Sequence, residues 1–142
     1  MPLIGLKNVK RAMNVDIYNQ MNDDIKGVYF NGLKLVIRET PADKGRARNN
    51  WFLSVGSPST KITTSKSKTG TGSFSQLMKM PARVLNRKLY FTNNLPYITT
   101  LEYGGYAQPG TDKTINGFSA QAPNGWLRTA LIKMANKIRS LT

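Results

Sequence analysis

The first forty residues carry the pattern that most constrains this fold, because their apolar side chains recur at steps of three and four. The members of this stripe are Leu6, Val9, Met13, Ile17, Met21, Ile25 and Val28. Such spacing aligns side chains along one side of a helix, and polar residues fill the other side. Pro41 disfavours helical geometry at Thr40, so we expect the helix to stop by Glu39. The pattern predicts one helix over residues 6–39.

Asn31-Gly32 lies inside this stretch, and such a pair often turns the chain. The apolar residues that follow, at positions 33–37, fit either a resumed helix or a buried strand. The periodicity alone leaves these two interpretations open.

Two short strands are expected in the middle of the chain. Residues 50–55 alternate, with Trp51 on one side and Phe52 on the other, and residues 89–91 are rich in aromatic side chains. We interpret Trp51 as a core anchor rather than a base-stacking platform, since aromatic residues on strands usually pack inward. Asn94 is a candidate cap for a short helix that ends at Gly104 or Gly105.

A second amphipathic helix is predicted over residues 123–140. Its apolar seam consists of Leu127, Leu131, Met134, Ile138 and Leu141, and we expect the seam to be core. Short helical pieces broken by Pro81 are expected over residues 74–87, and a loop over residues 106–120. The expected fold is therefore α+β: a single domain over residues 1–142, with a long N-terminal helix and a C-terminal helix packed on a small, mostly antiparallel sheet.

The charge of the chain is large and unevenly distributed. Lysine and arginine number 21 against 7 acidic residues, a net charge of +14. Residues 44–100 hold ten basic and no acidic residues, or +10. A potential this concentrated indicates a polyanionic partner or an acidic protein surface, although a solvated basic face that only aids solubility is the alternative.

Composition excludes several kinds of site. The chain has no cysteine and no histidine, which removes disulfides, thiolate metal ligands and the commonest general base. We find no nucleophile with a base, no metal constellation and no cofactor motif. No apolar run approaches the ~20 residues that cross a bilayer, so no membrane partner is expected. We therefore expect a protein that is not an enzyme, with no catalytic, cofactor-binding or metal-binding residues.

Residues 57–73 form a basic, low-complexity loop of Ser, Thr, Gly and Lys. One interpretation is a mobile arm that contacts DNA or a neighbouring subunit, and the other is a solvated loop. The candidate contacts to a partner or to DNA are Lys44, Arg46, Arg48, Lys61, Lys66 and Lys68.

Three segments together resemble one protein family. They are Thr40-Pro41-Ala42-Asp43-Lys44-Gly45-Arg46 with the later Trp51, the stretch NNLPYITTLEYGG at residues 93–105, and Gln121-Ala122-Pro123-Asn124-Gly125-Trp126-Leu127-Arg128. Their order and motifs are similar to those of the tail-completion or neck proteins of lambda-like and HK-type tailed phages. Ala42 and Lys44 depart from the family pattern, and residues 57–73 do not align with it.

The resemblance implies a structural virion protein at the head–tail junction, made in the host cytoplasm. It implies a homo-oligomeric ring of six or twelve copies that joins the capsid connector to the tail and surrounds the DNA channel. The implied partners are other phage neck, connector and tail proteins, together with the packaged DNA. It also favours a helix that continues to the Thr40-Pro41 pair. The alternative is a basic nucleic-acid-binding protein, supported by the charge of residues 44–100.

We expect the structural anchors to be Trp51, Tyr97, Glu102, Tyr103, Gly104 and Trp126. Glu102 is expected near the C-terminus of a short helix, where the macrodipole disfavours a carboxylate. We therefore predict that an arginine holds it, Arg46 or Arg128, because the guanidinium matches a carboxylate in two places. The alternative is a solvent-exposed glutamate of little consequence.

Overall fold

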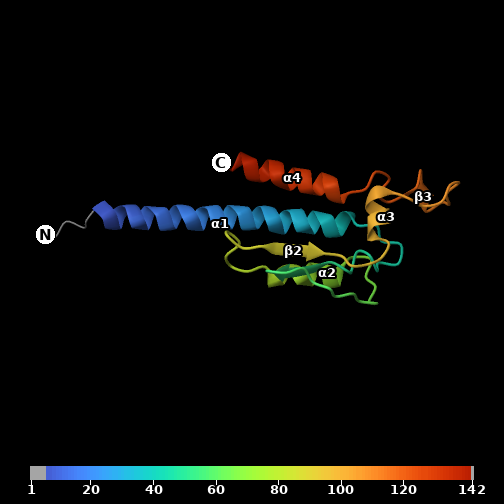
Figure 1. Cartoon of the computed structure of the whole chain (residues 1–142), viewed down its shortest axis with the longest axis horizontal. Coiled ribbons are helices and arrows are strands. Elements are labelled where there is room, and N and C mark those ends of the chain that lie inside the picture. Colours follow the sequence, from blue (N-terminus) through green and yellow to red (C-terminus); the bar gives the residue numbers. More distant parts are fainter. Residues whose placement is uncertain (1–5, 142) are drawn as a thin grey trace.

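A computed structural model describes residues 6–141, with side chains from residue 8 onward. Two helices dominate it: α1 (Leu6–Glu39) and α4 (Leu127–Ser140). Figure 1 shows α4 running beside the C-terminal half of α1, with the layer that contains β2 and α2 on the opposite side of α1. This arrangement confirms the predicted α+β class with its long N-terminal helix.

The Asn31-Gly32 pair does not interrupt α1, so the helical interpretation of residues 33–37 is confirmed. Gly32 has a packing role instead. A Cβ atom at Gly32 would lie 2.3 Å from Cγ of Met134, which is closer than two carbon atoms can approach. The missing side chain therefore lets α4 lie close against α1.

The sheet is smaller than expected and is divided in two. β1 (Phe52–Val55) pairs antiparallel with β2 (Leu89–Thr92), with Phe52 opposite Thr92 and Val55 opposite Leu89. β3 (Thr114–Ile115) and β4 (Phe118–Ser119) form a separate antiparallel hairpin.

The expectation of a plain loop at residues 106–120 was wrong, because this hairpin lies inside it. Asn116 and Gly117 connect its strands with φ angles of +50° and +85°. A two-residue Asn-Gly turn of this kind matches the twist of paired strands.

The short helices differ in their limits from the predicted ones. α2 (Thr71–Gln76) and the 3₁₀ helix η1 (Leu77–Lys79) begin and end earlier than residues 74–87. α3 (Ile98–Tyr103) follows Tyr97, and no side chain caps it. Asn94 instead donates its amide hydrogens to the carbonyl oxygens of Ser59 and Lys61, at 2.8 and 3.0 Å, so its assignment as a cap was wrong.

The core lies where the C-terminal half of α1 meets β1, α3 and the start of α4. Trp51 is 3% exposed, stacks on Phe91 with 5.0 Å between ring centroids, and donates from Nε1 to Oγ1 of Thr40 at 2.9 Å. Trp126 is also buried, and its Nε1 donates to the carbonyl oxygen of Val36. The interpretation of Trp51 as a core anchor is confirmed.

The seam of α4 is only partly core. Ala130 is buried against α1, whereas Leu131 is 52% exposed, so the expectation that Leu131 is core was wrong. The N-terminal stripe of α1 is likewise uncovered between Val9 and Met21. The side chain of Leu6, also assigned to that stripe, lies outside the described part of the chain.

Candidate partner-binding cleft

The three segments that resemble the phage family meet at one cleft of about 620 Å³. Its walls come from residues 41–47, from residues between Tyr97 and Tyr106, and from residues 112–121 that include the β3–β4 hairpin. The backbone N–H of Ala42 donates to Oε1 of Gln121 at 2.8 Å. This bond joins two of the segments across 79 positions of sequence.

The charged residues that line the cleft are mostly basic. Lys44, Arg46, Lys66 and Lys113 line it, opposed by Asp43 and Asp112. Nζ of Lys113 lies 3.0 Å from Oδ2 of Asp43, and this bond lowers the pKa of Asp43 and raises the pKa of Lys113. Asp43 is therefore already paired within the subunit.

Arg46 is the residue in the cleft with unmet bonding capacity. Its Nε atom is buried and has no hydrogen-bond partner. Tyr97 lines the same cleft; burial raises the pKa of its hydroxyl, and the charge of Arg46 opposes this effect. A buried donor without an acceptor is costly. The charged guanidinium to which this donor belongs is the kind of group that binds a carboxylate or a phosphate.

Glu102 joins two of the three segments, residues 93–105 and residues 121–128. Only 4% of it is exposed. Oε2 accepts the backbone N–H groups of Trp126 and Leu127, both at 2.8 Å, and Oε1 accepts the backbone N–H and Nε of Arg128, both at 2.9 Å. The prediction of a Glu102–arginine bridge is confirmed, with Arg128 and not Arg46 as the partner.

The bridge is also a helix cap, because the three backbone N–H groups belong to the first turn of α4. Burial acts to raise the pKa of Glu102, but the bonds from Arg128, Trp126 and Leu127 outweigh it, and the pKa lies below its ordinary value. Gly125 (φ +79°) precedes the cap, and a Cβ there would lie 2.4 Å from the carbonyl oxygen of Glu102. Only glycine allows this approach.

The other predicted anchors behave differently from one another. Gly104, with φ of +82°, ends α3 and lies against the ring of Phe118, where a Cβ would come within 3.1 Å. Tyr103 is 62% exposed, and the guanidinium carbon of Arg128 lies 4.5 Å from its ring centroid. Tyr103 therefore covers the Glu102–Arg128 bridge from the solvent side.

Arg48 lies beside the C-terminal end of α1 and outside the cleft. Its Nε donates to the carbonyl oxygen of Thr40 at 2.9 Å, and its Nη1 donates to the carbonyl oxygen of Lys68. Burial lowers its pKa, with Glu39 acting in the opposite direction. Arg48 thus connects α1 to the basic loop within the subunit.

The basic loop at residues 57–73 is held along the surface of the domain. Oδ1 of Asn50 accepts the N–H of Thr63, and Nδ2 of Asn50 donates to its carbonyl oxygen, at 2.9 and 3.0 Å. Asn49 similarly accepts the N–H of Gly72 at 2.7 Å. These bonds favour the interpretation as a loop over that as a free arm.

The structure therefore separates the six candidate contacts. Lys44, Arg46 and Lys66 share the cleft, whereas Arg48, Lys61 and Lys68 lie outside its walls. Lys113, Asp112 and Tyr106 complete the cleft and were not predicted. The Asn116-Gly117 pair could have predicted the hairpin from the sequence, and Lys113 lies just before its first strand.

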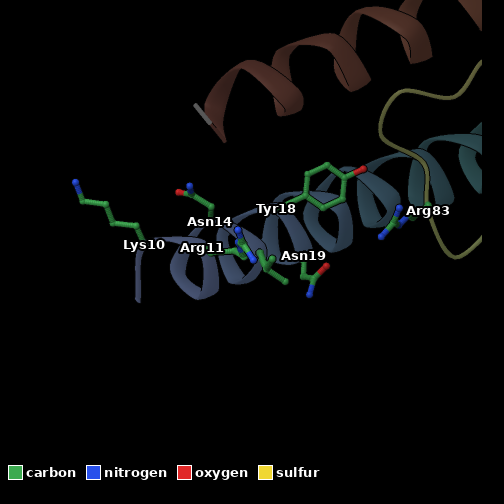
Figure 2. A pocket seen from close by; sticks show the side chains of 7 residues that line it. Lys10, Arg11, Asn14, Tyr18, Asn19 and Arg83 are labelled. Carbon is green, nitrogen blue, oxygen red and sulfur yellow. The ribbon is translucent and has the colours of Figure 1, made fainter. Parts of the chain in front are cut away.

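A second hollow, of about 680 Å³, lies near the start of α1 and was not predicted. Figure 2 shows Lys10, Arg11, Asn14 and Asn19 along α1 with Tyr18, and Arg83 approaching from a different segment. The guanidinium carbon of Arg83 lies 5.7 Å from the ring centroid of Tyr18. This contact joins the segment around Arg83 to α1.

Over residues 6–141, no group of three or more metal-ligating side chains occurs, and no helix has the length and apolar character needed to span a membrane. Comparison of the chain with family models, with curated proteins and with solved structures finds no match.

Proposed function

We propose that this chain is a structural virion protein of a tailed phage, and not an enzyme: a subunit of a ring at the head–tail junction that joins the capsid connector to the tail around the DNA channel. The observation that carries the proposal is the cationic cleft formed where the three resembling segments meet. It requires no cofactor, and it places the protein in the virion after synthesis in the host cytoplasm.

The cleft supports an interface of the kind that a ring needs. Rings are closed by heterologous contacts, in which one surface of a subunit meets a different surface of the next. Lys44, Arg46 and Lys66 offer positive charge, and Nε of Arg46 lacks an acceptor inside the subunit. An acidic group from a neighbouring copy, or from a connector or tail protein, fits this chemistry.

A second function has its own supporting observation. Residues 44–100 carry +10 with no acidic residue, as expected for a protein that binds nucleic acid through phosphates. In this alternative the cleft and the basic loop contact DNA directly, and no ring is required.

The two functions are separated by the mass of the purified chain, measured by analytical ultracentrifugation with and without duplex DNA. The ring predicts a discrete closed oligomer without DNA, alone or with the connector and tail proteins of its phage. Lys44→Gln with Lys66→Gln should weaken that oligomer, whereas Lys79→Gln with Lys88→Gln, an equal loss of charge outside the cleft, should not.

A monomer that binds duplex DNA at nanomolar affinity and forms no closed oligomer with any phage partner would favour the alternative. Equal effects of the two double variants would remove the cleft from the interface. Circular dichroism of each variant confirms that the fold is retained.

A further inference from the structure

The N-terminal half of α1 carries an uncovered apolar stripe. Val9, Met13, Ile17 and Met21 are 43%, 56%, 56% and 48% exposed. They follow one another at steps of four, so they are neighbours along one face of the helix. Figure 1 shows this half of α1 projecting beyond both α4 and the β1–β2 layer. A contiguous exposed apolar stripe of this kind marks an interaction surface.

The stripe continues the face of α1 that α4 covers. Val28 and Leu35, at steps of seven from Met21, line a hollow of about 540 Å³ together with Ala130 and Met134 of α4. The C-terminal end of α4, at Leu141, lies beside Asp24 and Val28. The stripe therefore begins where α4 ends, and whatever covers it lies as a continuation of α4 along the same face.

We propose that the stripe is covered by the same segment of a second copy of this chain, packed antiparallel to it. The first argument is charge. On the stripe side of the helix, Lys10 lies at one end of the segment and Asp24 at the other. Among the described residues neither of these two forms an ion pair; Asp24 accepts only the amide of Gln20 at 3.0 Å. An antiparallel pair brings opposite charges together, whereas a parallel pair would bring like charges together.

The second argument is steric. Because α4 lies on the stripe face of α1, a parallel pair would place both α4 helices at one level between the two α1 helices and would hold the stripes apart. In an antiparallel pair each stripe enters the space beyond the end of the other copy's α4. Both arguments select the same symmetric arrangement, an isologous contact with a two-fold axis near residues 15–17.

This pairing does not rest on the proposed ring. An isologous contact closes on itself with two copies, so it cannot generate a ring alone. If the chain also forms rings of six through the cleft, the α1 pairs join two such rings into an assembly of twelve.

The absence of cysteine from the chain makes the test clean, since each introduced thiol is the only one. Ile17→Cys with a short bismaleimide should give covalent dimers. Asn19→Cys, exposed on the opposite face of α1, is the matched control and should not. Val9→Cys and Met21→Cys should cross-link mainly when the two variants are mixed, because antiparallel packing places these positions opposite each other.

Charge exchange tests the pairing in solution. Lys10→Glu should weaken dimerisation at least about tenfold by sedimentation, since it places like charges together at both ends of the symmetric pair. Adding Asp24→Lys to the same chain should restore it.

Equal cross-linking of Ile17→Cys and Asn19→Cys, or efficient cross-linking of Met21→Cys alone, would overturn the antiparallel pair. The proposal would also be overturned if the chain alone gave no dimer and the stripe became covered only when another phage protein was added. A twelve-copy assembly whose mass is unchanged by Ile17→Asp would overturn this inference and leave the proposed function intact.

Discussion

Glu102 shows how one buried carboxylate connects two elements. It lies at the C-terminal end of α3, where the macrodipole of its own helix disfavours it. Its oxygens nevertheless face the first turn of α4, whose free N–H groups favour negative charge. The second effect prevails because Glu102 makes three direct backbone bonds there, in addition to the bond from Arg128.

Replacement of Glu102 by glutamine should lower the free energy of unfolding by about 1–3 kcal/mol, because the amide cannot accept at both positions and leaves buried N–H groups unpaired. Chemical denaturation of the isolated subunit measures this. Glu39→Gln is the control: its bond to Arg38 is exposed at 3.7 Å, so its loss should cost below ~1 kcal/mol. Equal losses in the two variants would contradict the role of Glu102 as a cap.

The lowered pKa of Glu102 gives the contribution a defined pH range. A carboxyl whose folded pKa lies below its unfolded value stabilises the fold above the unfolded value, about 4.3 for glutamate. This stabilisation is lost as the pH falls through the folded pKa. The difference in unfolding free energy between the wild type and Glu102→Gln should therefore be constant near pH 7 and shrink below pH 4; a difference that grows on acidification would contradict this sign.

At the scale of elements, α4 illustrates how a helix is placed by small residues. Ala130 is 3% exposed and faces α1, and Gly32 of α1 provides the space for Met134. The larger Leu131 is displaced to the edge, where it lines a groove of about 490 Å³ with residues of α1 and β2. The face that packs is therefore rotated from the apolar seam that the spacing predicted.

Two neighbouring substitutions test this rotation. Ala130→Leu should destabilise the subunit by about 1–3 kcal/mol, since Ala130 is 3% exposed and the added atoms would overpack its surroundings. Leu131→Ala should cost less than ~1 kcal/mol, because half of the side chain is already exposed. Thermal or chemical unfolding of both variants gives the comparison. A larger loss of unfolding free energy for Leu131→Ala would show that the predicted seam is the buried face.

The basic loop is an element held by side chains rather than by a core. Asn50 is fully buried and bonds to Thr63 through both ends of its amide, and it also donates to the carbonyl oxygen of Arg46. Asparagine suits this position because one side chain offers a donor and an acceptor together.

Asn50→Ala should therefore release the loop and cost about 1–3 kcal/mol through the unpaired groups that it leaves. Amide hydrogen exchange is the direct measurement: the N–H of Thr63 should lose protection in the variant. The backbone amides within β1 and β2 serve as the internal control and should keep their protection; unchanged exchange at Thr63 would show that the loop is held by other contacts.

For the whole molecule, the net charge is +14, and the lysines of the basic loop that contribute to it lie at different places on the surface. Lys66 lines the cleft, while Lys61 and Lys68 are in the same basic loop but outside the cleft walls. We predict that all three face an acidic neighbouring subunit or the DNA channel.

Changing Lys61, Lys66 and Lys68 to glutamine should weaken assembly or DNA retention. It should also reduce the slope of log affinity against log salt by about 2–3, since each phosphate contact contributes roughly one. Lys34, Lys133 and Lys137, exposed on α1 and α4, provide a control with equal loss of charge. Unchanged particle yield together with unchanged salt dependence would contradict the prediction.

Local physics determined much of this protein from its sequence. The spacing of apolar residues predicts the helix α1, and Pro41 predicts that it ends at Glu39. Both signals are local, because each concerns residues within a few helical turns of one another. Trp51 in the core and the exclusion of histidine- and cysteine-based sites follow from residue type alone.

Only the tertiary structure decided which arginine meets Glu102, which face of α4 is buried, and that Lys44, Arg46, Lys66 and Lys113 share one cleft. These features join residues that are distant in sequence, and they depend on how elements approach in space. Leu131 was misplaced for this reason: periodicity gives the direction of an apolar seam, whereas the close approach at Gly32 and Ala130 selects the face that packs.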